Sequence, residues 1–179
     1  MLVGLLSAFA LVLAASGVLK LRSPDPTVRA VLATKLPGAW RLAGRPFVRV
    51  IALGEVLVAA LVLVAGGVVA AALLTVAYLS LALVAWRLVR RAPGQDCGCF
   101  GKASEPVSRW HVGMNLAGAA TGALALVLPG PSLAQELGSS GALAALQLIA
   151  VVLAACLIYL VMTALPAHSA LRAKVLTRS

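Results

Sequence analysis

The chain has 179 residues, of which 62% are hydrophobic and 11% are charged, and its mean hydropathy is +1.05. A soluble domain of this size carries about a quarter charged residues, so the composition excludes an ordinary water-soluble protein and predicts one compact domain in a bilayer. The formal net charge of +10 comes from 15 Lys and Arg against 5 Asp and Glu. In so apolar a chain this excess indicates topology signals and contacts with anionic lipids rather than nucleic-acid binding.

Five stretches are long and apolar enough to cross a bilayer core of about 30 Å as helices. In chain order they are residues 2–22, 47–65, 68–89, 108–128 and 142–165. The first has no basic residue ahead of it and the length of a full span, so we expect a span rather than a cleaved signal peptide. The second and third come from one apolar run that is interrupted at Gly66-Gly67, a pair typical of a tight turn. The pattern predicts an all-α integral membrane bundle of five transmembrane helices, with residues 1–166 as the membrane domain.

Basic residues are confined to three parts of the chain. All 15 Lys and Arg lie within residues 20–49, 87–109 and 172–178. A five-span topology places these three segments on one face, and the N-terminus, the Gly66-Gly67 turn and the loop 129–141 on the other. The positive-inside rule then predicts an outer N-terminus, a cytoplasmic C-terminus and a basic cytoplasmic tail at residues 167–179.

Few polar residues interrupt the predicted spans, and each is a candidate functional group because burying it in lipid is costly. Glu55 is the only acidic residue in a span, and Lys20 lies near the cytoplasmic end of the first, so we expect an ion pair between them. A purely structural pair is the alternative. His111 and Asn115 are four residues apart and share one helix face. Each also has a purely structural interpretation. His111 could lie at the level of the lipid head groups, and Asn115 could form a hydrogen bond to a neighbouring helix. We expect these four residues in one polar pocket at the cytoplasmic end.

Two further features of the spans have structural interpretations. Gly118 and Gly122 form a GxxxG pattern, which permits close helix approach, and we expect that approach within this chain rather than between copies. Cys156 lies in the middle of the fifth predicted span among Ala and Leu. We expect it to be an inert, small core residue.

Cys97 and Cys99 lie in the loop between the third and fourth predicted spans, separated by Gly98 and expected at the cytoplasmic face. Four basic residues surround them: Arg90, Arg91, Lys102 and Arg109. Nearby cations and a helix N-terminus lower a thiol pKa, and a disulfide at this spacing closes only with strain, which favours exchange over structure. The alternatives are a soft-metal site with His111 as a third ligand and a loop with no chemical role. Two thiolates and one His are few for zinc, which usually takes four ligands.

Three segments in order resemble one membrane protein family. They are SGVLKLRSP at 16–24, ALGEVLVAALVL at 52–63 and CGCFG at 97–101, the last followed by a helix that opens SRWHVGMNL. They resemble the MauE branch of the DoxX-like proteins. The resemblance implies a four-helix core plus one C-terminal helix in the plasma (inner) membrane of a bacterium. It also implies a thioredoxin-like partner and a role in maturing the disulfide-rich small subunit of methylamine dehydrogenase.

By this resemblance, five residues of this chain correspond to functional positions of the family: Lys20, Glu55, Cys97, Cys99 and Phe100. Where the family commonly has Arg-Asn in the next helix, this chain has Met114-Asn115, so His111 is assigned from this sequence alone. We therefore expect a membrane thiol–disulfide redox protein. Its predicted catalytic residues are Cys97, Cys99, Glu55 and His111, and its predicted cofactor-binding residues are Lys20, Phe100 and Asn115. A quinone is the candidate cofactor, no metal or nucleic acid is expected, and the oligomeric state is left open. A carrier of soft metals (Cu, Zn or Hg) and a non-catalytic assembly factor are the alternative functions.

Overall fold

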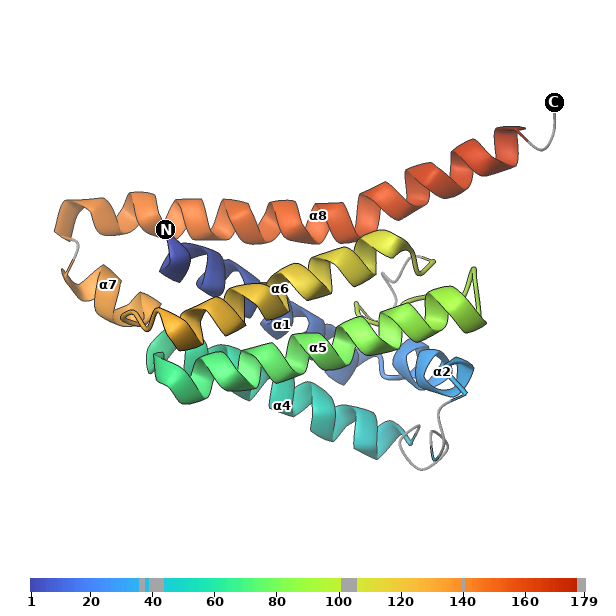
Figure 1. Cartoon of the computed structure of the whole chain (residues 1–179), viewed down its shortest axis with the longest axis horizontal. Helices are drawn as coiled ribbons and strands as arrows, with labels where there is room; N and C mark the ends of the chain where they lie inside the picture. The colour runs from blue at the N-terminus through green and yellow to red at the C-terminus, as the bar shows by residue number, and fades with distance from the viewer. Residues whose placement is uncertain (36–37, 39–43, 101–105, 140, 177–179) are drawn as a thin grey trace.

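The computed structural model describes residues 1–35, 38, 44–100, 106–139 and 141–176, with only the backbone described at 142 and 165–176. Every regular element within these ranges is helical. The helices are α1 (Leu2–Arg22), α2 (Asp25–Ala33), α4 (Arg45–Val64), α5 (Gly67–Arg91), α6 (Arg109–Val127), α7 (Leu133–Ser139) and α8 (Ala144–Leu176), with a 3-10 turn at Gly141–Leu143. Figure 1 shows the long helices lying side by side as one elongated bundle.

Among the described residues, four helices are long and apolar enough to cross a membrane: α1, α4, α5 and the Ala144–Ala164 part of α8. They coincide with four of the five predicted spans, and the break between the second and third lies at Gly66, whose φ is +65°. The helix of the fourth predicted span is present as α6, but α6 is not among the four candidate spans. Its first two turns contain Arg109, His111 and Asn115, which lower its mean hydropathy.

The C-terminal part of the chain differs from the prediction in length. Helix α8 continues past Pro166 to Leu176, so a part of the predicted basic tail belongs to the last helix. Residues 177–179 of that tail and Lys102 of the cysteine loop lie outside the described residues. Two short helices, α2 and α7, were not predicted, because neither is long enough to produce the apolar run by which spans were recognised.

Glycines set the closest helix contacts in the bundle. A Cβ on Gly17 of α1 would lie 2.6 Å from the carbonyl oxygen of Ala52 in α4. A Cβ on Gly118 of α6 would lie 2.8 Å from the ring of Tyr78 in α5, and one on Gly122 would also meet α5. The GxxxG prediction is thus confirmed: its glycines allow α6 to pack against α5 of the same chain.

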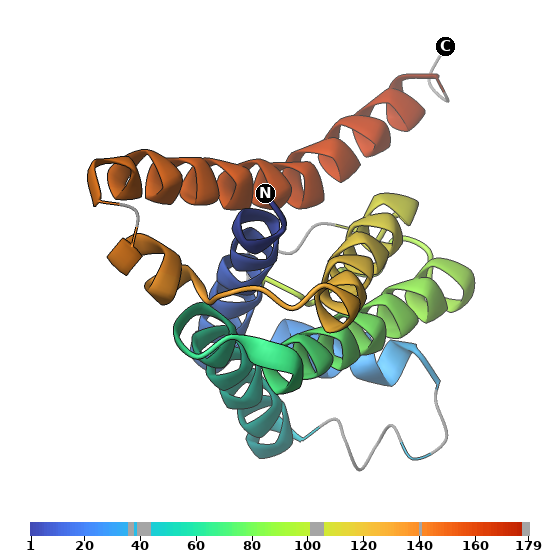
Figure 2. The same cartoon turned by 60° about the vertical axis from the view of Figure 1, so that its left-hand side comes forward.

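Helix α8 packs along α1 at the edge of the bundle (Figure 2). The expectation that Cys156 is a core residue was wrong, because its side chain is exposed. It lies beside an apolar groove that α8 forms with α1. A peripheral helix buries only the face that meets its neighbours, so a position in the middle of its length does not have to be in the core.

Candidate active site at the cysteine loop

The loop between α5 and α6 folds back into the bundle. A turn follows α5, with the N–H of Gln95 donating to the carbonyl of Ala92, and the N–H of Val107 donates to the carbonyl of Gln95 at 2.9 Å. Asp96 and Pro106 form an isolated antiparallel bridge. These contacts bring the two described ends of the loop together and direct residues 97–100 inward. The side chains of Cys97 and Cys99 are 3% and 4% exposed.

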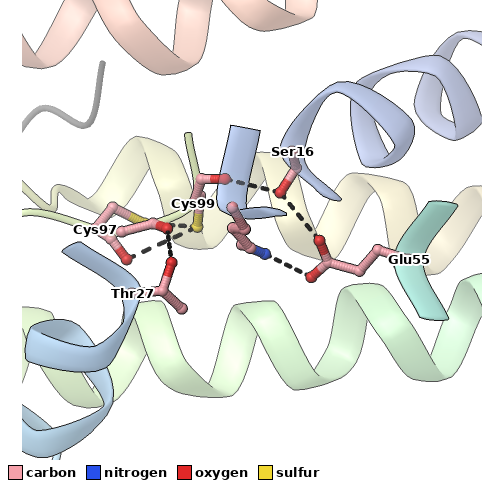
Figure 3. Close-up of polar contacts among 7 residues, drawn as sticks. Ser16, Thr27, Glu55, Cys97 and Cys99 are labelled. Carbon is pink, nitrogen blue, oxygen red and sulfur yellow. Dashed lines mark hydrogen bonds and ion pairs between the residues drawn. The ribbon is translucent and has the colours of Figure 1, made fainter. Parts of the chain in front are cut away.

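The two cysteines face each other. Their Sγ atoms are 2.9 Å apart and both thiols are free, whereas a disulfide bond is about 2.05 Å long. In Figure 3 the two cysteines lie next to each other. Because formation of a bond needs only a small further approach, the geometry suits a pair that alternates between dithiol and disulfide.

Gly98 allows this geometry through its backbone. Its φ is +71°, a conformation that is unfavourable for residues with a Cβ. A Cβ at this position would also lie 2.9 Å from the Cα of Thr27 and 3.0 Å from the Cβ of Ala30, both in α2. The Thr27 hydroxyl donates to the Gly98 carbonyl at 2.6 Å. The short helix α2 therefore holds the loop from one side.

A buried polar network holds the loop from the other side. The Lys20 ammonium on α1 lies 2.5 Å from Glu55 Oε1 on α4, which confirms the predicted ion pair. The Ser16 hydroxyl donates to the Cys99 carbonyl at 2.8 Å and lies 3.4 Å from Glu55 Oε2. Ser16 and Lys20 are one helical turn apart on the same face of α1. Figure 3 shows Ser16 between the cysteine loop and the Glu55 carboxylate.

The environment makes the two thiols unequal. The hydrogen bond between the sulfurs lowers the pKa of Cys99, and the positive charge of Lys20 lowers it further. The same hydrogen bond, together with burial, raises the pKa of Cys97 well above its usual value. These directions favour Cys99 over Cys97 as the thiol that ionises. The sequence did not distinguish the two.

The cysteines lie at one end of a cavity of about 410 Å³ between α4 and α5. Lys20, Thr27 and Glu55 line it together with Cys97 and Cys99, and most of the remaining wall consists of aliphatic side chains. The volume is in the range of small-molecule sites. Lys20, Glu55, His111 and Asn115 were expected in one polar pocket. Of these four residues, Lys20 and Glu55 line the cavity.

His111 and Asn115 are buried but occupy other positions. His111 Nδ1 accepts a hydrogen bond from the Ser108 N–H at 3.2 Å and lies 3.1 Å from the Ser108 hydroxyl, which caps the N-terminus of α6. Asn115 Nδ2 donates to the His111 carbonyl at 2.8 Å. Asn115 also borders a small internal space of about 10 Å³ beside Ser16 and Cys99. Asn115 thus lies near the cysteine loop, whereas the described contacts of His111 belong to the helix cap.

Phe100 connects the loop to α8. Its ring packs edge-on against Tyr159, with the ring centroids 5.0 Å apart, and its side chain is buried in the apolar core. This contact fixes the residue that follows Cys99. No group of three or more His, Cys, Asp or Glu side chains that could hold a metal ion occurs in the part of the chain that the structure describes.

Sequence reasoning did not identify Ser16 and Thr27 as site residues. Ser16 had a usable signal, because it is polar, lies in an apolar span and precedes Lys20 by one helical turn. Thr27 had none, since its role depends on α2 folding back against the loop.

Comparison with known proteins identifies one family. The model of the family described as "Methylamine utilisation protein MauE" matches residues 1–129, which include α1 to α6 and the cysteine loop. Searches of curated proteins and of solved structures gave no match. Because the match spans well over half of the 179 residues, the chain belongs to the MauE family of membrane proteins linked to methylamine utilisation.

Proposed function

We propose that this protein is a membrane thiol–disulfide redox protein in which Cys97 and Cys99 alternate between dithiol and disulfide. The observation that carries the proposal is the 2.9 Å approach of two buried sulfurs beside the buried Lys20–Glu55 pair. Burial of the Lys20 ammonium beside the thiols costs free energy, because an ionisable group inside a membrane protein loses its hydration. A chemical role for the thiols accounts for that cost, whereas an inert loop does not.

The unequal thiols assign the order of steps. The Cys99 thiolate attacks one sulfur of a partner's disulfide, and the partner's other sulfur leaves as a thiolate. The Cys97 thiol then loses its proton and attacks Cys99 Sγ, which releases the reduced partner and leaves a Cys97–Cys99 disulfide. The same steps in reverse oxidise a partner.

Neighbouring groups support these steps. Lys20 stabilises the Cys99 thiolate by its charge, and Glu55 holds Lys20 in place. Glu55 is also the carboxylate that lines the same cavity as both cysteines, so we assign to it the acceptance of the Cys97 proton. His111 is less suited to that role because its Nδ1 already accepts from Ser108.

The orientation follows from the charge distribution. We propose five spans, with α6 as the fourth, because α6 packs against α5 and its 19 residues reach about 28 Å at 1.5 Å per residue. With five spans every Lys and Arg lies on one face, which puts the cysteine loop on the cytoplasmic side of a bacterial inner membrane. From the resemblance to MauE proteins we propose a thioredoxin-like partner and a biological role in the maturation of a disulfide-rich, methylamine dehydrogenase-type protein. The family's link to methylamine utilisation supports that role.

Thiol labelling of whole cells tests the proposal. In a Cys156→Ala background, a membrane-permeant maleimide applied after denaturation should label Cys97 and Cys99 more strongly when the sample has first been reduced. Cys97→Ser should instead trap a mixed disulfide at Cys99, visible as a species that disappears on reduction. Equal labelling with and without reduction, and no trapped species, would contradict the proposal. Stoichiometric copper or zinc that is lost in Cys97→Ser would replace it with the metal-binding alternative.

A further inference from the structure

The cavity at the cysteine pair opens between two membrane-spanning helices. Most of its wall comes from α4 and α5, and the rest comes from α2, Lys20 of α1 and the cysteine loop. Ile51 of α4 is 45% exposed and Val76 of α5 is 60% exposed, and both line it. Large aliphatic side chains exposed within spanning helices face lipid, so the opening connects the cysteine site with the hydrocarbon of the bilayer.

The inner end of the cavity has different chemistry. Cys97, Cys99, Lys20 and Glu55 line it there, and the two cysteines are only 3% and 4% exposed. A protein partner reaches these sulfurs only after the loop has moved. A small molecule dissolved in the membrane reaches them through the cavity with the loop in place.

A reactant that fits both ends must meet two requirements. It must dissolve in the bilayer and enter between aliphatic walls, and it must exchange electrons with a dithiol. Closing the Cys97–Cys99 disulfide releases two electrons and two protons. Among bilayer-dissolved molecules, isoprenoid quinones accept two electrons and two protons and become quinols, so the reaction balances without another reactant.

We propose that the cavity between α4 and α5 is a quinone site, in which a membrane quinone oxidises the Cys97–Cys99 dithiol to a disulfide and leaves as the quinol. The inference rests on the proposed redox function and adds its electron acceptor. The S–S bond forms, both S–H bonds break, and the two hydrogens end on the two quinone oxygens. The quinone ring lies at the cysteine end and its tail passes between α4 and α5 to the lipid.

The residues at the inner end suit the change in charge during the reaction. The Lys20 ammonium has three N–H donors, and Glu55 Oε1 accepts one of them. A remaining donor can stabilise negative charge on a quinone oxygen before that oxygen is protonated. A lipid acyl chain would fill the aliphatic part of the cavity equally well, but it has no polar or redox-active group that could interact with the thiols or the ammonium.

Gly54 offers a way to close the cavity with little disturbance of the fold. It lines the cavity in the middle of α4, and a Cβ added to it would meet nothing within 4 Å. Leu at this position would occupy the path of the ligand and is a better helix former than Gly. Gly113 of α6 is a matched control, since a Cβ there also meets nothing within 4 Å and the residue is not on the cavity wall.

The experiment uses the full-length protein in phosphatidylcholine vesicles, reduced and freed of reductant. Decylubiquinone is added, and quinol formation is followed by absorbance while free thiols are counted by mass after alkylation. Reduction of oxidised glutathione is measured in parallel as a quinone-independent assay of the thiols. We expect one quinol per dithiol, none with Cys99→Ser, and a ratio of quinone to glutathione reduction at least tenfold lower in Gly54→Leu than in Gly113→Leu.

The outcomes separate this inference from the proposed function. Wild-type protein that reduces glutathione disulfide but not decylubiquinone overturns the quinone site and leaves the redox function standing. Equal ratios in Gly54→Leu and Gly113→Leu, with both variants folded, overturn the assignment to this cavity. A phospholipid that copurifies with wild-type protein but not with Gly54→Leu, and that decylubiquinone does not displace, shows that the cavity holds an acyl chain. Protein that reduces neither probe contradicts the proposed function itself.

Discussion

The interior where α1 meets α4 and the surface where α2 meets α4 each contain one ion pair, and the two pairs have nearly the same length. Lys20 and Glu55 lie 2.5 Å apart with side chains 2% and 7% exposed. Asp25 and Arg45 lie 2.6 Å apart with side chains 50% and 67% exposed. The contacts are alike in geometry, but their surroundings are not.

This difference shows that the surroundings of a charge, rather than the contact distance, determine what the pair does. Water screens the Asp25–Arg45 pair, and such pairs contribute little to stability even with the two hydrogen bonds seen here. In the interior each charge has lost its hydration and depends on its partner. The buried pair therefore couples α1 to α4 and acts on the neighbouring thiols, whereas the exposed pair only connects two helix ends.

Removal of one buried partner should have the largest effect. Glu55→Ala leaves the Lys20 ammonium buried without its carboxylate, and we expect a loss of about 3–5 kcal/mol in the free energy of unfolding. Thermal or denaturant unfolding of the protein in detergent measures it.

The same comparison supplies two controls for that prediction. Arg45→Ala breaks the exposed pair and should leave the unfolding midpoint within experimental error of wild type. The double variant Lys20→Met/Glu55→Leu removes both buried charges and should recover most of the stability lost in Glu55→Ala, because an apolar pair of similar size can replace a buried ion pair. If Arg45→Ala were as damaging as Glu55→Ala, burial would not be the deciding factor.

A smaller effect is expected where the cysteine loop meets α2. Gly98→Ala imposes a Cβ on a backbone with φ +71° and brings it to within 2.9 Å of Thr27. The backbone strain alone costs about 1–2 kcal/mol, and the steric contact should add to it and displace the thiols. Gly94→Ala is the matched control, since Gly94 has φ +90° and open space around it. Unfolding measurements should rank Gly98→Ala as clearly worse than Gly94→Ala, and equal losses would show that the approach to α2 is unimportant.

The smallest change concerns the thiol pKa and leaves the fold intact. The hydrogen bond from Cys97 is the main cause of the lowered pKa of Cys99, so Cys97→Ala should raise that pKa. Because only the thiolate is alkylated, the pH profile of iodoacetamide labelling at Cys99 should move to higher pH. The measurement uses a Cys156→Ala background for both proteins. A profile that stays in place, or moves to lower pH, would show that Cys97 does not act as the donor.

The sequence predicted the long helices well because a membrane imposes a length and a composition on each span. The first predicted span, residues 2–22, coincides with α1, and the Gly66-Gly67 break lies where α4 gives way to α5. Hydropathy did not reveal α2, whose nine residues are too short for a span. It also misplaced Cys156, because hydropathy reports that a helix is in lipid and not which of its faces meets protein.

The predicted site residues that the structure brings together are those that are rare in their context. Lys20 and Glu55 were recognisable because charges inside spans need partners, and Cys97 and Cys99 were recognisable by their spacing. His111 was grouped with them by its position along the chain, but its ring faces the cap of its own helix. The position of a residue along a span gives its depth in the membrane, but it does not determine which neighbouring helix or loop its side chain contacts.

The amino-acid sequence by itself determined that the chain is a membrane protein, where its long helices run, and which few polar residues interrupt them. These properties depend on local composition, and the bilayer acts on each segment separately. The tertiary structure alone decided that the loop folds inward, that the two sulfurs face each other beside the Lys20–Glu55 pair, and that both cysteines line a cavity between α4 and α5. Those properties depend on distances between segments up to 83 residues apart, such as Ser16 and Cys99, and only packing sets such distances.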